Sequence, residues 1–251
     1  MGKRGQVVLI GGGPGDPGLL TVRGRDELLI ADVIVADRLG PTDMLREIGV
    51  TAEIRDVGKR PYHHPVPQEQ INQILIERAK AGQRVARLKG GDPFVLGRGG
   101  EEYAACLAAG VEVEVIPGVS SAIAAPAAAA IPVTHRGVST GVLVISGHDE
   151  IEADLLVRWP HTIVVLMGMA RLGELSAALI RAGMERTRPV GVVEQAWTAR
   201  QRCVRGTIDT IADDVARMGV RNPATIVIGD VVNAVADDAL ARVGPDLVGS
   251  R

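Results

Sequence analysis

Two glycine-rich segments carry the residues of this chain that are best suited to ligand chemistry. The longer one, residues 87–102 (RLKGGDPFVLGRGGEE), places two glycine pairs and several charged side chains between an apolar run and a helical segment. Glycine accepts positive φ and lets the backbone approach a ligand closely, and Asp92 is kept out of the helical region by Pro93, which fixes a turn. Because α/β proteins bind small molecules at the carboxyl ends of strands, we interpret this segment as a ligand-binding loop.

The second segment, residues 11–18 (GGGPGDPG), follows another apolar run. Its glycines match G-x-G-x-x-G, and Asp37 ends the next predicted strand, so an NAD-binding protein is one interpretation. However, Asp16 would repel a pyrophosphate, and Pro14 and Pro17 lack the N–H groups that a phosphate cradle uses. The segment therefore favours a neutral or cationic nucleoside, and S-adenosylmethionine, with its sulfonium, fits that description.

The elements that must position these loops alternate between strand and helix. Residues 68–81 have apolar side chains at helical spacing, and a helix is also expected before Ala31. Alternation of this kind predicts a mainly parallel sheet covered by helices. The runs that predict its strands are 6–10, 33–36, 52–57, 84–88 and 111–116.

Beyond residue 136 the pattern predicts a second sheet, in which residues 202–206 form an edge strand. We therefore expect an α/β fold of two α/β domains with mainly parallel or mixed sheets. The predicted divisions are an N-terminal α/β domain at 5–116, a connecting segment at 117–136 and a C-terminal α/β domain at 137–240.

Composition excludes several classes of function. A formal net charge of −2 and 2% aromatic residues predict no nucleic-acid partner, because neither a basic field nor base-stacking side chains are available. Residues 115–133 are apolar, but prolines interrupt them, so we expect no membrane span. Cys106 and Cys203 form no C-x-x-C pair, so we expect no metal site, two buried thiols, and a reducing, cytoplasmic location.

Several segments in order and in register resemble the tetrapyrrole methylase family, and within it the branch that methylates uroporphyrinogen III. The resemblance extends over about residues 5–235. The segments that carry it are GGGPGDPG at 11–18, DRL at 37–39, VGKR at 57–60, PQEQIN at 67–72, residues 87–102, PGVSSA at 117–122 and PVTHR at 132–136.

The resemblance implies two domains with an active-site cleft between them, in a cytoplasmic homodimer. It implies methyl transfer from S-adenosyl-L-methionine, which leaves S-adenosyl-L-homocysteine, to C2 and C7 of the tetrapyrrole uroporphyrinogen III, giving precorrin-2 for cobalamin or sirohaem. A methylase of a later precorrin intermediate and a diphthine synthase are the alternatives within this interpretation. From the glycine motif alone, an NAD-binding regulatory protein remains a more distant alternative.

The resemblance also implies roles for individual residues, with no metal. Asp37 falls on the proton acceptor and Lys59 on the proton donor, although pairing of Lys59 with a substrate carboxylate is an equally good hypothesis. The implied cofactor-binding residues are Pro14, Gly90, Gly91, Asp92, Val95, Ser120, Ser121, Met167, Ala196 and Thr225. The positive side chains available for an acidic substrate are Arg38, Lys59, Arg60, His63, His64, Arg98, His135 and Arg136.

Overall fold

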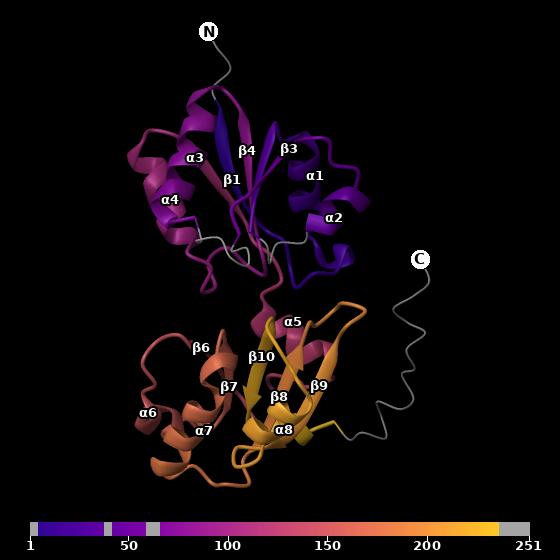
Figure 1. The fold of residues 1–251 in the computed structure, drawn as a ribbon, viewed down its shortest axis with the longest axis vertical. Coiled ribbons are helices and arrows are strands. Elements are labelled where there is room, and N and C mark those ends of the chain that lie inside the picture. Colours follow the sequence, from indigo (N-terminus) through magenta and orange to yellow (C-terminus); the bar gives the residue numbers. More distant parts are fainter. Residues whose placement is uncertain (1–4, 38–41, 59–65, 236–251) are drawn as a thin grey trace. The chain divides into compact units, whose positions relative to one another are not determined.

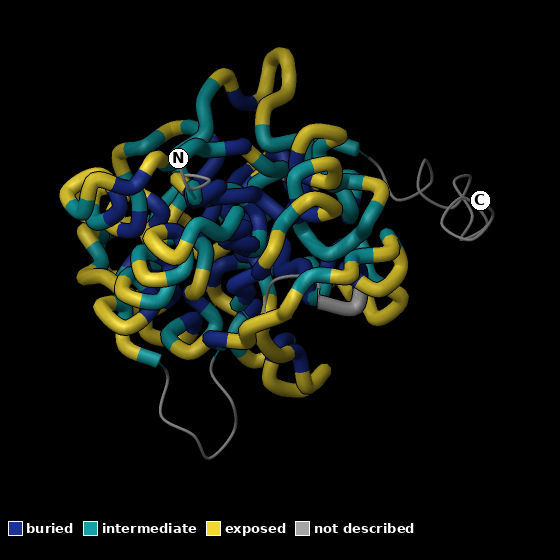
Figure 2. Tube along the Cα trace, turned by 90° about the horizontal axis from the view of Figure 1, so that it is seen from above, coloured by how far each residue is buried: buried dark blue, intermediate teal, exposed yellow. Residues whose placement is uncertain are grey.

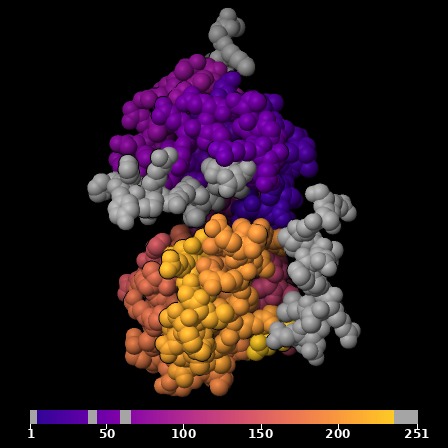
Figure 3. Space-filling view, turned by 45° about the vertical axis from the view of Figure 1, so that its right-hand side comes forward, coloured from indigo at the N-terminus to yellow at the C-terminus, as the bar shows by residue number. Residues whose placement is uncertain are grey.

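The computed structural model describes residues 5–37, 42–58 and 66–235. The chain divides into two compact units, Met1–Ser121 and Ala122–Arg251. In Figure 3 the described residues of the first unit are drawn in indigo to magenta, and most of those of the second in orange to yellow. The division falls inside the segment that the sequence predicts as a connection. Each unit is built on its own sheet, and each is treated separately below.

The described part of the first unit contains a five-stranded parallel sheet in the order β3-β2-β4-β1-β5. Helices cover both faces of this sheet (Figure 1). The strands are β1 (Gln6–Gly11), β2 (Val33–Ala36), β3 (Glu53–Asp56), β4 (Arg84–Lys89) and β5 (Glu112–Ile116). The helices are η1 (Pro17–Leu19, a 3-10 turn), α1 (Val22–Ile30), α2 (Thr42–Glu47), α3 (Gln68–Lys80) and α4 (Gly99–Ala108).

The sheet of the first unit buries apolar side chains on both faces, as parallel sheets do. Alternate residues of β1 separate cleanly: Val7 and Leu9 pack with α3 and α4, whereas Val8 and Ile10 pack with α1 and α2. In Figure 2 the buried positions, in dark blue, lie beneath exposed turns of the surrounding segments, in yellow. The loops after β1, β2 and β4 therefore start from buried strands, whereas β3 at the edge of the sheet is exposed.

The second unit carries a mixed sheet in the order β6-β7-β10-β8-β9, in which only β6 and β7 are parallel among the described pairs. Its strands are β6 (Val142–Ser146), β7 (Thr162–Leu166), β8 (Pro189–Glu194), β9 (Arg202–Thr207) and β10 (Ala224–Ile228). Its helices are α5 (Ser121–Ala128, which starts at the division), α6 (Ala153–Arg158), η2 (Met169–Arg171), α7 (Leu172–Arg181), α8 (Ile211–Arg217) and η3 (Asp230–Asn233).

One face of this second sheet packs against α6, α7 and α8, and the other packs against α5 and η3. The predicted α/β fold class is confirmed, and so is the edge position of the strand near residue 202. The prediction that both thiols are buried is wrong for Cys203, which is exposed, while Cys106 is buried. Side chains alternate along the edge strand β9, so Val204 faces the core and Cys203 faces outward.

No helix among the described residues is both long enough and apolar enough to cross a membrane. The apolar stretch near residue 120 instead forms α5, whose alanines pack on the second sheet.

Candidate active site

The two glycine-rich loops follow neighbouring strands at the point where the chain changes direction across the first sheet. From β1 the chain crosses to β2 on one side, whereas from β4 it crosses to β5 on the other side. Ligands of open α/β sheets bind at such switch points, beyond the carboxyl ends of the strands. The loops also contact each other, because the amide of Gly91 donates to the carbonyl of Gly13 at 2.7 Å and the amide of Gly13 donates back at 3.2 Å. The predicted loops therefore form one structure.

A third loop, after β5, joins them through glycine. A Cβ atom on Gly118 would lie 2.3 Å from the carbonyl oxygen of Gly91 and 2.7 Å from the Cα of Gly11. Both neighbours are backbone atoms, so only a residue without a side chain fits there. This contact brings Ser120 and Ser121, two predicted cofactor residues, beside Gly91, at which a Cβ would lie 3.4 Å from the amide nitrogen of Ser121.

Two aspartates stabilise the turns of these loops. Asp92 accepts hydrogen bonds from the amide of Phe94 at 2.8 Å through Oδ1 and from the amide of Gly118 at 3.0 Å through Oδ2. Asp16 accepts from the amide of Gly18 at 2.7 Å. Both residues are half-buried, and each carboxylate oxygen has lone pairs for a further donor. These turn-forming contacts leave the predicted role of Asp92 toward the cofactor a prediction.

The remaining predicted cofactor residues of the first unit lie along the same edge. Pro14 and Val95 are half-buried within the loops after β1 and β4, and Gly90 directly follows β4. The loop after β4 also holds two non-glycine residues in the left-handed region, Leu96 with φ 53° and Arg98 with φ 58°. Such conformations cost free energy and persist where the surrounding structure imposes them.

A buried cluster of charged side chains lies beneath Asp37, which follows β2. Arg87 and Lys89 of β4 are two residues apart, so both point to the face that packs against α3 and α4. Their side chains are 1% and 5% exposed, and that of Glu102 on α4 is fully buried. The Asp37 side chain is 31% exposed. The cluster therefore has one carboxylate near the solvent and one in the interior.

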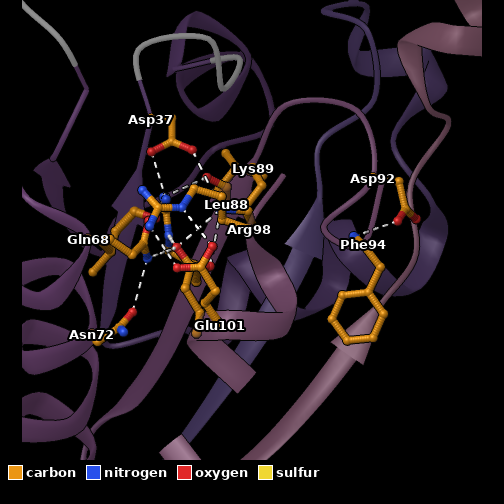
Figure 4. Close-up of polar contacts among 12 residues, drawn as sticks. Asp37, Gln68, Asn72, Leu88, Lys89, Asp92, Phe94, Arg98 and Glu101 are labelled. Atoms are coloured by element: carbon orange, nitrogen blue, oxygen red, sulfur yellow. Dashed lines mark hydrogen bonds and ion pairs between the residues drawn. The ribbon is translucent and has the colours of Figure 1, made fainter. Parts of the chain in front are cut away.

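Arg87 joins the two carboxylates. Its Nη2 donates to Asp37 Oδ1 at 2.7 Å, and its Nε donates to Glu102 Oε1 at 3.0 Å. Lys89 Nζ lies 3.1 Å from each oxygen of Glu102 and 3.8 Å from Asp37 Oδ2. Gln68 of α3 completes the cluster by donating to Glu102 at 3.1 Å. Figure 4 shows Asp37 directed toward Lys89 and its neighbours, whereas Asp92 and Phe94 are drawn apart from them.

The charges of this cluster balance, with two cations facing two carboxylates. Burial lowers the pKa of Lys89 from its ordinary value, and the positive charge of Arg87 lowers it further, while Glu102 and Asp37 oppose this shift. Truncating one partner of such a buried set costs about 3–5 kcal/mol, because an uncompensated charge is left in the interior. The position of the Asp37 carboxylate is thus set by groups that cannot easily move.

In the second unit the predicted cofactor residues gather at one end of the sheet. Met167 follows β7, Ala196 follows β8, and Thr225 in β10 pairs with Leu166 of β7 and Val193 of β8. Met167 is 39% exposed, whereas Ala196 and Thr225 are buried. The structure therefore brings these three residues together within their own unit.

Backbone strain marks the same end of the second sheet. Met167 has φ 58°, and Gln195 and Trp197, on either side of Ala196, have φ 45° and 61°. The indole of Trp197 donates to the carbonyl of Ala124 in α5 at 2.7 Å, which fixes the loop after β8 on that helix. Left-handed residues with bulky side chains concentrate at functional loops, so this geometry marks the region independently of residue chemistry.

The structure does not assign the remaining sequence-based candidates to these groups. Lys59, together with Arg38, Arg60, His63 and His64, lies outside the described residues. Arg98 is exposed and pairs with Glu101 at 2.7 Å, and His135 and Arg136 are also exposed. Within 5–37, 42–58 and 66–235, no group of three or more His, Cys, Asp or Glu side chains is placed to hold a metal.

Sequence reasoning missed the roles of Arg87, Lys89 and Glu102. The predicted strand at 84–88 already contains Arg87, but Lys89 and Glu102 were treated only as charges of the segment 87–102, whereas β4 extends to Lys89. The signal that finds them is their spacing: two charged residues at i and i+2, on the face that Val85 shares with the core. A charged residue at such a position needs a buried partner.

A family model described as Tetrapyrrole (Corrin/Porphyrin) Methylases matches residues 6–212. This span includes the whole first sheet and strands β6 to β9 of the second, and it ends within α8. The chain belongs to the tetrapyrrole methylase family. The predicted family is thereby confirmed.

Two relatives are similar over nearly all of this chain. A uroporphyrinogen-III C-methyltransferase of Methanocaldococcus jannaschii is 43% identical, with 92% of this chain and 98% of that protein covered. Siroheme synthase 2 of Yersinia pestis is 42% identical over 92% of this chain, which spans 49% of that longer protein.

A solved structure of uroporphyrin-III C-methyl transferase from Thermus thermophilus, in complex with S-adenyl homocysteine, has a TM-score of 0.80 and 38% sequence identity. The match covers 92% of this chain and 100% of the Thermus chain.

Proposed function

We propose that this chain transfers methyl groups from S-adenosylmethionine to C2 and C7 of uroporphyrinogen III and yields precorrin-2, for cobalamin or sirohaem synthesis. The observation that carries the proposal is the 43% identity to a uroporphyrinogen-III C-methyltransferase across 98% of that protein. Family membership alone would leave the acceptor open, whereas similarity at this level over the full length supports the same acceptor.

The loops of the first unit suit a cationic methyl donor. The groups offered at the switch point are the carboxylates of Asp16 and Asp92 and the hydroxyls of Ser120 and Ser121, rather than a row of amides and cations for a phosphate. S-adenosylmethionine supplies an electrophilic methyl group on its sulfonium. The chain's own contribution is to hold donor and acceptor in line, since positioning alone provides much of the rate acceleration.

We assign the proton acceptor to Asp37. A proton must leave the macrocycle after the new carbon–carbon bond forms, and a carboxylate can take it. The Arg87 contact at 2.7 Å holds Asp37 Oδ1, while the partial exposure of the side chain leaves it accessible to a substrate. We propose Lys59 as the proton donor or as the partner of a substrate carboxylate.

We extend the proposal to the cofactor residues of both units. Pro14, Gly90, Gly91, Asp92, Val95, Ser120 and Ser121 would contact the donor from the first unit, and Met167, Ala196 and Thr225 from the second. Their grouping at one sheet edge in each unit supports this. We also propose that the protein is a cytoplasmic homodimer, as the resemblance implies.

The test is an anaerobic incubation of the purified protein with uroporphyrinogen III and S-adenosylmethionine, followed by mass spectrometry. The expected product carries two additional methyl groups. Competition with a later precorrin intermediate distinguishes the alternative acceptor, and calorimetry with NAD and S-adenosylhomocysteine distinguishes the dinucleotide alternative. Absence of any mass gain at saturating substrate would exclude the proposed reaction.

The dinucleotide alternative is also disfavoured by the fold. In the fingerprint of dinucleotide-binding proteins the glycine-rich turn leads directly into a helix whose amino terminus holds the pyrophosphate. Here η1 and Thr21, the N-cap of α1, separate the glycine segment from that helix. The strand order β3-β2-β4-β1-β5 also differs from that of the dinucleotide fold, in which the first strand lies beside the second.

A further inference from the structure

The cluster beneath Asp37 contains more charge than is needed to orient one carboxylate. Arg87 donates a hydrogen bond to Asp37 at 2.7 Å, and Lys89, 3.8 Å from the other oxygen of Asp37, is buried with Glu102 in the same cluster. Without Asp37, the three buried groups carry two positive charges and one negative charge. The groups around Asp37 therefore carry a net charge of +1, and this charge is set by three side chains that are buried.

The described groups that act on Asp37 come from three elements. Arg87 and Lys89 belong to β4, Glu102 belongs to α4, and Gln68 of α3 contributes an uncharged amide to Glu102. Arg98 and Glu101, also near the start of α4, are exposed and pair with each other, so their charges largely cancel. Charges interact strongly in the interior because the local dielectric is low.

We propose that Lys89 and Glu102 are positioning residues that set the proton affinity of Asp37 in opposite directions, through one buried charge cluster. The proposal rests on the assignment of Asp37 as proton acceptor. Lys89 stabilises the Asp37 carboxylate and weakens it as a base. Glu102 neutralises part of the positive charge of Arg87 and Lys89, and so keeps Asp37 basic enough to take a proton from the macrocycle.

The lowered pKa of Lys89 agrees with this arrangement. Burial and the Arg87 charge both disfavour the ammonium form, and Glu102 is the first carboxylate that opposes them. Lys89 Nζ lies 3.1 Å from Glu102 Oε2, so the two side chains act on Asp37 from the same buried position with opposite charge.

Opposite charge removals provide the test. In K89M the cluster beneath Asp37 becomes neutral, so the acid limb of the kcat profile should move to higher pH. In E102Q the cluster gains a second uncompensated cation, so the limb should move to lower pH and kcat should fall. An opposite charge within about 4–6 Å shifts a carboxyl titration by about 1–3 units. The double variant K89M/E102Q restores one net cation and should return the limb toward its original position.

A direct measurement separates this inference from the proposed reaction. The carboxyl carbon of Asp37, assigned by its absence in D37N, can be titrated by carbon-13 NMR in each folded variant without substrate. Opposite displacements in K89M and E102Q would support the inference even if uroporphyrinogen III were not the acceptor. Displacements in the same direction, or no displacement, would overturn it even in an active enzyme.

The matched control is E27Q. Glu27 of α1 pairs with Arg84 at the opposite end of β4, with 2.8 Å between Oε2 and the Arg84 Nε. Its removal leaves an unpaired arginine in the same strand, but away from Asp37, so we expect no displacement of the Asp37 titration. If E102Q fails to fold, the balanced double variant and K89M still decide the question: K89M must move the titration upward, and the double variant must reverse that movement.

Discussion

The two units of this protein bring their candidate residues together by different physical means. In the first unit, glycines and charged side chains dominate: the loops after β1, β4 and β5 meet at Gly11, Gly91 and Gly118, above a buried set of ion pairs. In the second unit the candidates are Met167, Ala196 and Thr225, which carry no charge, and left-handed backbone occurs at Met167 and on both sides of Ala196.

The two units therefore differ in the kind of group that their candidate residues offer to a ligand. The candidates of the first unit are groups that can accept hydrogen bonds and, as proposed for Asp37, a proton, and compensating charges are buried beside Asp37. The proposed donor-binding residues of the second unit are uncharged, and none of them is proposed to react. Variants of the first unit should therefore act mainly on turnover or on loop integrity, and variants of the second on affinity for the donor.

The largest expected effect is on turnover in D37N. Asparagine keeps an oxygen for Arg87 but cannot take a proton, and general-base catalysis contributes about 10²–10⁴-fold. We expect kcat to fall by that factor while S-adenosylhomocysteine binding, measured by calorimetry, stays unchanged. D26N serves as the control, because Asp26 is exposed and pairs with Arg25 at the surface. Undiminished kcat in D37N would remove Asp37 from the reaction.

The next effect is on the junction of the three loops. In G118A the added Cβ would lie 2.3 Å from the Gly91 carbonyl oxygen, so backbone must shift and the predicted donor site must distort. We expect affinity for S-adenosylhomocysteine to fall at least about tenfold, which corresponds to about 1.4 kcal/mol. G110A is the control: Gly110 has φ 71° and no atom within 4 Å of its Cβ position, so it carries backbone strain alone.

Much of the first unit could be predicted from the sequence because its signals are local. Apolar runs separated by glycine-rich turns predict parallel strands. The glycine and charged residues of the segment 87–102 predict a binding loop. The charge cluster was not predicted, because its members come from the end of β2, from β4 and from α4. The sequence of one segment does not show which distant segment its charged side chains will pair with. The one local signal of the cluster is the spacing of Arg87 and Lys89 at i and i+2, on the same face of β4.

The candidate residues of the second unit could not be predicted from their own chemistry. Nothing in the chemistry of Met167 or Ala196 marks either residue, and both were proposed through the family resemblance. Their common position depends on the antiparallel placement of β10 between β7 and β8, which brings Thr225 beside Leu166 and Val193. Positive φ at Met167 and Trp197 is likewise a tertiary effect, because local preference opposes it for side chains of this size.

A smaller effect tests whether the strain of the second unit is functional. M167G should relieve a φ of 58° and raise the free energy of unfolding by up to about 1 kcal/mol. If the side chain contacts the donor, affinity for S-adenosylhomocysteine should fall about tenfold or more, since burial of a methionine contributes about 1.5–3 kcal/mol. Ala130, with φ 51° and no predicted role, gives the matched control A130G. Equal affinity in both variants would exclude Met167 from the site.

A last effect, on stability rather than on activity or affinity, contrasts the two thiols, one in each unit. Burial raises the pKa of Cys106 from 9.0 to about 11, and the nearby charge of Glu102 adds to the shift. The folded chain therefore keeps a proton that the unfolded chain loses between these values, so this contribution to stability is complete below pH 9.0 and is lost as the pH rises through about 11.

Urea unfolding of wild type and C106A across that range measures the contribution. The difference between their free energies of unfolding should shrink by up to about 2.7 kcal/mol as the pH rises, because each unit of pKa shift corresponds to about 1.36 kcal/mol. The contribution of Lys89 to the pH dependence is present in both proteins and cancels in the difference between their free energies of unfolding. C203A, which removes the exposed thiol, should follow wild type. If the difference in free energy of unfolding between wild type and C106A did not change with pH, the interior around Glu102 would not disfavour a second negative charge. The buried charge cluster would then be a weaker basis for contrasting the first unit with the second.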